Sequence, residues 1–178
     1  MPRYEPIEHG VEVLGSSINS TISSLPENIE TIANQIFAQH GIENPVDEKW
    51  YPNETNLAAL SEIYEKLGSS MLQKIGRDKP KNTVWPPDIE TATDAVMSIN
   101  EAYQRNHRNG KVGGYHAEQI NPGHMKLTCN NPYPCQFDQG LIEGVVFKFA
   151  TETALVNEVG DECRKEGGEQ CTYEVHLY

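Results

Sequence analysis

Apolar residues recur at helical spacing through most of the first half of the chain. This periodicity predicts one helix over residues 26–41, a second over 53–76 and a third over about 88–103. Residues 11–25 could form another short helix, although one glycine and five serines weaken that pattern. The first part of the chain is therefore expected to be mainly helical.

Strand-like alternation replaces the helical pattern in the last third. Residues 110–129 are predicted to form a hairpin, because an Asn-Pro-Gly turn at 121–123 separates two extended runs. A wide apolar face predicts a helix beginning at Cys135, and residues 154–159 and 171–178 are expected to pair as antiparallel strands. The prediction is an α+β fold, in which N-terminal helices pack on a C-terminal twisted antiparallel sheet with a crossing helix.

Length and composition limit the domain organisation. A chain of 178 residues suits one domain, and 37% apolar residues is too high for a disordered chain. We therefore expect a single ligand-binding domain over residues 1–178. Its helical part would cover about 9–106, and its sheet and metal part about 110–178.

The charge balance excludes several classes of partner. The formal net charge is −12, from 26 acidic and 14 basic residues, so the chain would repel nucleic acids and anionic lipids. The sequence has no apolar run of the roughly 20 residues that a spanning helix needs, and its first residues do not resemble a signal peptide. We expect a cytoplasmic protein that binds no nucleic acid and does not span a membrane.

All four cysteines lie in the last third of the chain, at Cys129, Cys135, Cys163 and Cys171. In a reducing compartment, clustered cysteines are more often metal ligands or free thiols than disulfides. Pairing of the last two strands would bring Cys163 and Cys171 together, with Cys135 arriving from a loop, and thiolates suit Zn²⁺. Two alternatives remain open: buried apolar thiols and a Cys163–Cys171 disulfide.

Motifs for catalysis are missing from the sequence. It contains no nucleophile elbow, P-loop, dinucleotide fingerprint or His-Glu-x-x-His motif, so we do not expect an enzyme. His107, His116 and His124 are expected to be exposed turn residues. Among them His116 is the best candidate for contact with a ligand, and His124 could reach the metal.

Two segments, residues 131–144 (NPYPCQFDQGLIEG) and 162–175 (ECRKEGGEQCTYEV), resemble the 4-vinyl reductase family. These proteins are also called hydrocarbon-binding proteins, and they are structurally related to haem-nitric-oxide-binding (H-NOX) domains and to TRAPP adaptor subunits. The resemblance covers about 48 residues, and its most specific element is a Cys-x7-Cys motif with an internal Gly-Gly.

The resemblance implies an apolar pocket between the helices and the sheet, with a structural zinc ion beside it. The matching positions give Cys135, Cys163 and Cys171 as ligands, with Glu158, Asp161 or Cys129 as candidates to complete the set. An apolar or aromatic small molecule would fill the pocket, and the domain would signal to a separate protein. A homodimer is a further expectation.

Six residues are predicted to line that pocket: Tyr64, Tyr103, His116, Phe137, Leu141 and Val145. Haem-binding relatives use a Tyr-x-Ser-x-Arg element and a proximal histidine, and this sequence has no Tyr-x-Ser-x-Arg. The main prediction is therefore a small-molecule sensor with a structural zinc site. The alternatives are a haem- or tetrapyrrole-binding gas sensor of the H-NOX type and a tetrapyrrole-modifying enzyme.

Overall fold

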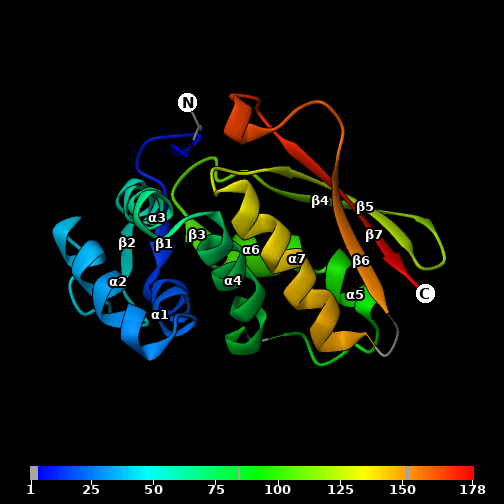
Figure 1. Cartoon of the computed structure of the whole chain (residues 1–178), viewed down its shortest axis with the longest axis horizontal. Coiled ribbons are helices and arrows are strands. Elements are labelled where there is room, and N and C mark those ends of the chain that lie inside the picture. Colours follow the sequence, from blue (N-terminus) through cyan, green and yellow to red (C-terminus); the bar gives the residue numbers. More distant parts are fainter. Residues whose placement is uncertain (1–3, 84, 151–152) are drawn as a thin grey trace.

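The computed structural model describes residues 4–83, 85–150 and 153–178, and most of its helices come from the first half of the chain (Figure 1). The helices up to residue 105 are α1 (Gly15–Ser23), α2 (Glu27–Gln39), α3 (Asn53–Leu67), α4 (Ser69–Asp78), the 3₁₀ helix η1 (Lys79–Asn82), α5 (Ala92–Met97) and α6 (Ile99–Arg105). Their buried apolar side chains join those of the sheet in one core cluster.

A small antiparallel sheet ties the N-terminal segment to the end of α6. It consists of β1 (Glu12–Leu14), β2 (Trp50–Pro52) and β3 (His107–Arg108), in the order β2-β1-β3. The sequence pattern does not predict this sheet, because strands of two or three residues are too short to show a periodicity. It fixes the backbone at His107, whose side chain is buried.

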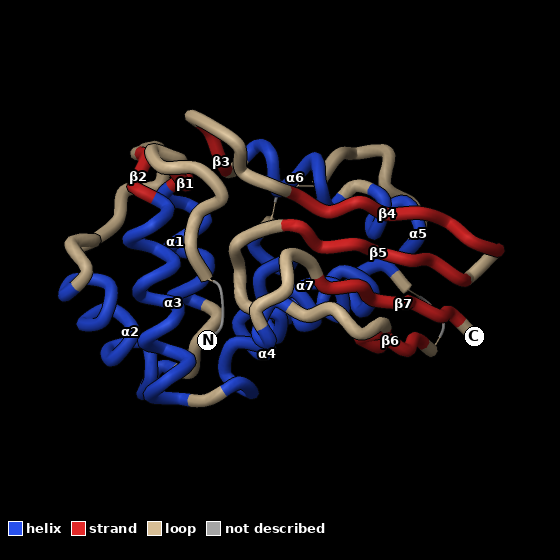
Figure 2. Tube along the Cα trace, turned by 90° about the horizontal axis from the view of Figure 1, so that it is seen from above, coloured by secondary structure: helices blue, strands red, loops and turns tan. Residues whose placement is uncertain are grey.

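The main sheet has four antiparallel strands. They are β4 (Gly114–Asn121), β5 (His124–Asn130), β6 (Ala154–Val159) and β7 (Cys171–Leu177), in the order β4-β5-β7-β6 (Figure 2). Helix α7 (Cys135–Phe149) crosses one face of the sheet, and the 3₁₀ helix η2 (Arg164–Glu166) lies between β6 and β7. Alternate strand residues such as Leu127 and Tyr173 are buried toward α7. The α+β prediction is confirmed.

Helices α4 and α7 approach each other closely because glycines line their contact. A Cβ atom added at Gly76 would lie 2.1 Å from the carbonyl oxygen of Phe137. At Gly140 it would lie 2.0 Å from the carbonyl oxygen of Gln73, and at Gly144 2.1 Å from that of Arg77. The two backbones are therefore in contact, which positions the start of α7 and the cysteine there.

Two helix predictions need correction. The helix expected over 53–76 is two helices, since Gly68 between α3 and α4 has a φ of +82°, which breaks the helical path. The helix expected from about 88 begins only at Ala92, after a capping box formed by Thr91 and Asp94, and Ser98 divides it into α5 and α6. Over the described ranges, no helix has both the length and the apolar character to cross a bilayer.

Candidate functional site

Three cysteine thiols converge at one end of the main sheet. Cys135 is the first residue of α7, Cys163 precedes η2, and Cys171 is the first residue of β7. Cys135 Sγ lies 3.1 Å from Cys171 Sγ and 3.4 Å from Cys163 Sγ, and the remaining pair is 3.7 Å apart. The Cys163–Cys171 pair does not form the disulfide that the sequence left open, because an S–S bond is about 2.05 Å long and both thiols are free. The three Sγ–Sγ distances are close to the ~3.8 Å between sulfurs on a tetrahedral zinc ion with Zn–S bonds of about 2.3 Å.

A carboxylate completes a set of four ligands. One side-chain ligand atom from each of Cys135, Glu158, Cys163 and Cys171 lies within 4.8 Å of all the others. Cys129 is fully buried and faces Cys171 across the β5–β7 pair, but it does not belong to this group of four. Of the predicted candidates for the fourth ligand, Glu158, Asp161 and Cys129, the geometry favours Glu158. We call this set the thiol cluster.

The thiol cluster favours a thiolate at Cys171. The pKa of Cys171 is lowered to about 6, first by the hydrogen bond from Cys135 and then by the nearby Arg164. That hydrogen bond and burial raise the pKa of Cys135, and burial raises that of Cys163 to about 11. A cation at the cluster would take the place of the shared protons, because metal ligands bind as thiolates.

A buried ion pair connects the thiol cluster to the core. Arg164 donates to Asp138, and the side chains of both residues are almost inaccessible to solvent, at 2% and 0%. The same guanidinium lies 3.5 Å from Cys171 Sγ and 2.6 Å from the side-chain oxygen of Asn131. Tyr115 donates from its hydroxyl to Asp138 at 2.5 Å. The chain Cys171–Arg164–Asp138–Tyr115 thus runs from the cluster to a cavity wall.

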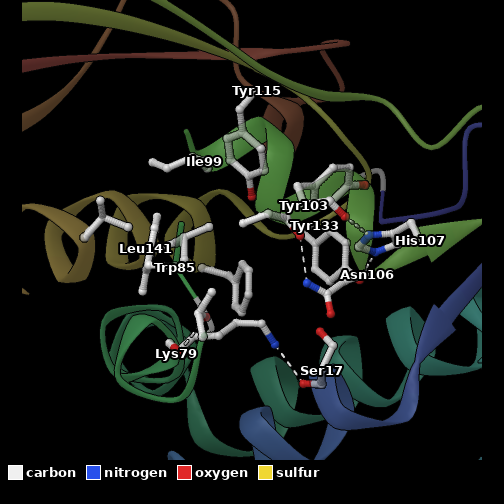
Figure 3. A pocket seen from close by; sticks show the side chains of 14 residues that line it. Ser17, Lys79, Trp85, Ile99, Tyr103, Asn106, His107, Tyr115, Tyr133 and Leu141 are labelled. Atoms are coloured by element: carbon white, nitrogen blue, oxygen red, sulfur yellow. Dashed lines mark hydrogen bonds between the residues drawn. The ribbon is translucent and has the colours of Figure 1, made fainter. Parts of the chain in front are cut away.

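That cavity lies among α1, η1, α6 and α7 (Figure 3). The cavity has a volume of about 50 Å³, which is enough for a few waters or a small molecule. Its lining is mainly aromatic and aliphatic: Trp85, Ile99, Ala102, Tyr103, Tyr115, Tyr133, Phe137, Leu141 and Val145, with Ser17, Lys79, Thr83, Asn106 and His107 as polar members.

Among the described residues that line the cavity, Lys79 alone carries a basic amino group. Its ammonium donates to the carbonyl oxygen of Ser17 at 2.8 Å (Figure 3). It also donates to Thr21 Oγ1 at 3.0 Å. Among the described residues no carboxylate lies within ion-pair distance, and burial lowers the pKa of Lys79 to about 7. An ammonium has three donors, so one N–H remains for a ligand.

His107 is fully hydrogen-bonded at the same wall. Its Nδ1 lies 2.8 Å from the carbonyl oxygen of Tyr103, and its Nε2 lies 2.8 Å from the Tyr133 hydroxyl. Burial lowers the pKa of His107 to about 4, so the ring is neutral at pH 7. The prediction of an exposed turn histidine is wrong here, because β3 holds this residue against the core.

The six predicted pocket residues divide into two groups. Tyr103, Phe137, Leu141 and Val145 line the cavity. Tyr64, on α3, packs at the edge of the core and does not line it. His116 lies on the exposed face of β4, 3.1 Å from Glu118, and borders an open polar groove instead. The aromatic and polar residues that sequence reasoning missed are Trp85, Tyr115, Tyr133, Lys79 and His107.

Solved structures of H-NOX domains have the same fold. An oxygen-binding H-NOX domain related to soluble guanylate cyclases matches 92% of this chain and 94% of its own, with a TM-score of 0.69 and 16% identity. An H-NOX protein from S. oneidensis in the Fe(II)NO ligation state matches 93% and 99%, with a TM-score of 0.69 and 14% identity. A T. tengcongensis H-NOX variant matches 92% and 96%, with a TM-score of 0.70 and 16% identity. No protein-family model and no curated protein matches the sequence.

The alternative prediction, a gas sensor of the H-NOX type, names the fold that these neighbours share with this chain. The 4-vinyl reductase and TRAPP relationships stay predictions, since these structures do not show them. At 14–16% identity, the likeness shows the fold alone.

The cavity residues do not fit a haem. The cavity is far smaller than the several hundred Å³ typical of sites for larger ligands. Axial ligation by His107 Nε2 would break its hydrogen bond with Tyr133. The aromatic rings of Tyr103, Tyr133 and Phe137 pack at centroid distances of 5.3–6.0 Å and would have to separate. The thiol cluster, by contrast, has the donor types and spacing that suit zinc.

Proposed function

We propose that this chain is a small-molecule sensor domain on an H-NOX-like fold, with a structural Zn²⁺ in the thiol cluster. The observation that carries this proposal is the convergence of three thiols and a carboxylate within 4.8 Å. Zn²⁺ would be held by Cys135, Cys163, Cys171 and Glu158, a set that cross-links the start of α7 to β6 and β7. Such a metal stabilises a sheet end where apolar packing is thin.

The proposed ligand is a small apolar or aromatic molecule with one anionic or hydrogen-bond-accepting group. The aromatic lining supplies the apolar contact, and the free N–H of Lys79 supplies the anchor. An anion would also neutralise an ammonium that has only neutral partners within the described part of the chain. An apolar cavity of about 150 Å³ holds benzene, so this cavity of about 50 Å³ would have to widen by movement of its lining side chains to admit an aromatic ring.

The Arg164–Asp138 ion pair supports a link between ligand and metal. Tyr115 lines the cavity and donates to Asp138, while Arg164 contacts both Asp138 and Cys171. A ligand that moves the Tyr115 hydroxyl would therefore change the packing at the thiol cluster. A change of this kind can shift the population of a state that a separate signalling protein recognises. We propose binding and signalling as the role, and catalysis is not part of it.

Metal analysis tests the zinc site. Reduced wild-type protein purified with zinc should contain about one Zn²⁺ per chain, the stoichiometry of a four-ligand site. Cys163→Ser should lose the metal, while Cys129→Ala should retain it, because Cys129 is outside the cluster. Equal zinc content in both variants would contradict the assigned ligands.

The second candidate is a haem-binding gas sensor, and the H-NOX neighbours favour it. Incubation of the protein with haem, followed by an absorption spectrum, separates the two candidates. A stoichiometric Soret band that is lost in His107→Ala would establish the haem sensor and overturn the proposal. Only non-specific haem absorbance, unchanged in His107→Ala, is the result expected from the small cavity.

A further inference from the structure

Two histidines and a glutamate form a second cluster on the outer face of the main sheet. His124 begins β5 and faces His176 of β7 in the strand register, and Glu174 precedes His176 by two residues on the same face. Met125, which follows His124 in β5, and Val175, which lies between Glu174 and His176 in β7, are fully buried. Strand alternation therefore directs all three side chains of the cluster away from α7.

Their ligand atoms lie close together. Glu174 Oε2 is 3.4 Å from His176 Nε2 and 3.7 Å from His124 Nε2, and one ligand atom of each residue lies within 4.8 Å of the other two. Ligands on a tetrahedral ion with bonds of about 2.0–2.1 Å are about 3.3–3.4 Å apart. The two carboxylate–imidazole distances are thus near the values for a bound ion.

A second observation points to a missing ligand. His124 Nε2 is buried, and among the described residues it has no hydrogen-bond partner. A buried ring nitrogen without a partner is unfavourable, and a metal ion would satisfy it. The imidazole rings of His124 and His176 stack at 4.2 Å with an interplanar angle of 21°. They would have to rotate for both Nε2 lone pairs to meet one ion.

We propose that His124, His176 and Glu174 bind a divalent transition metal ion such as Zn²⁺ or Ni²⁺. Two imidazoles and one carboxylate suit these ions and leave positions open for water or an anionic ligand. The site is distinct from the thiol cluster. His124 and Cys129 are five residue steps apart along extended β5, which is about 17 Å at roughly 3.3 Å per residue. His124 therefore does not reach the thiol cluster, contrary to the sequence prediction, and this proposal does not depend on the zinc proposed there.

The test is a calorimetric titration of untagged Cys163→Ser protein with Ni²⁺, because this background removes the complete thiol cluster as a competing site without adding Zn²⁺. The expected result is saturable binding of one Ni²⁺ per chain, weakened by at least about tenfold in His124→Ala and in His176→Ala, since even second-shell changes cause that loss. His116→Ala is the matched control. It removes an exposed histidine next to a glutamate on the same sheet, and should leave the affinity unchanged.

Nuclear magnetic resonance of the wild-type protein tests the same site without a variant. Paramagnetic Ni²⁺ should broaden the imidazole resonances of His124 and His176 before those of His116. The absence of saturable Ni²⁺ binding would overturn the proposal. Equal affinity in all three variants, or equal broadening of all three histidines, would also overturn it.

Discussion

At the scale of single residues, charged side chains in the interior carry most of the chemistry of the site. A sequence pattern treats Asp138 and Arg164 as solvent-facing charges, because the sequence alone does not distinguish a solvated charge from one in a buried ion pair. The structure buries both and gives each several partners. The Cys-x7-Cys spacing predicted the thiols, but nothing in the sequence marked Arg164, Lys79 or His107 as interior.

Asp138→Asn tests the buried ion pair. The substitution leaves the Arg164 guanidinium buried without its counter-charge, so we expect a loss of about 3–5 kcal/mol in the free energy of unfolding. Glu101→Gln, in the exposed pair with Arg105, is the control and should cost less than about 1 kcal/mol. Urea unfolding of both variants measures the difference. Equal small losses would mean that the ion pair is solvated.

Lys79→Met tests the amino group on the cavity wall. Burial lowers the folded-state pKa of Lys79 from 10.5 to about 7, so the unfolded chain binds this proton more tightly. The wild-type protein should therefore gain stability, relative to the variant, as the pH rises from about 7 to 10.5. Because the residue is half-buried, we expect a gain of about 1–3 kcal/mol. Lys66→Met, at an exposed site, should show no such gain, and a gain of equal size in both would contradict burial as its cause.

At the scale of elements, long periodic segments were predictable and short or interrupted ones were not. The hairpin, α7 and the last two strands follow from alternation, a turn motif and a continuous apolar face. The break at Gly68 was missed because apolar positions keep helical spacing on both sides of it. Gly76 was mistaken for a helix end, whereas its function is to allow α4 to contact α7.

Gly144→Ala tests this close helix contact. Helix propensity alone predicts a stabilisation of about 1 kcal/mol. The structure predicts the opposite sign, a destabilisation of about 1–3 kcal/mol, because the new Cβ would lie 2.1 Å from the Arg77 carbonyl oxygen. Thermal unfolding measures the sign, and Ser70→Ala on the exposed side of α4 is the control. A stabilised Gly144→Ala would contradict the backbone contact.

At the scale of the whole molecule, the arrangement of helices and sheet was predictable, whereas the ligand was not. The α+β plan follows from element order, and the family resemblance of the C-terminal motif anticipated the likeness in fold to H-NOX domains. The helices close around a cavity whose size depends on how the aromatic side chains pack, and a sequence does not specify that packing. The 4-vinyl reductase resemblance, the single domain, the cytoplasmic location and the homodimer stay predictions.

Zinc X-ray absorption spectroscopy of reduced protein that contains one equivalent of Zn²⁺ observes the ligands of the proposed zinc site directly. We expect three sulfur ligands at about 2.3 Å and one oxygen ligand at about 2.0–2.2 Å, from Cys135, Cys163, Cys171 and Glu158. Glu158→Gln should change the oxygen shell and leave the three sulfurs in place. A first shell of nitrogen and oxygen without sulfur would mean that the thiol cluster does not bind zinc.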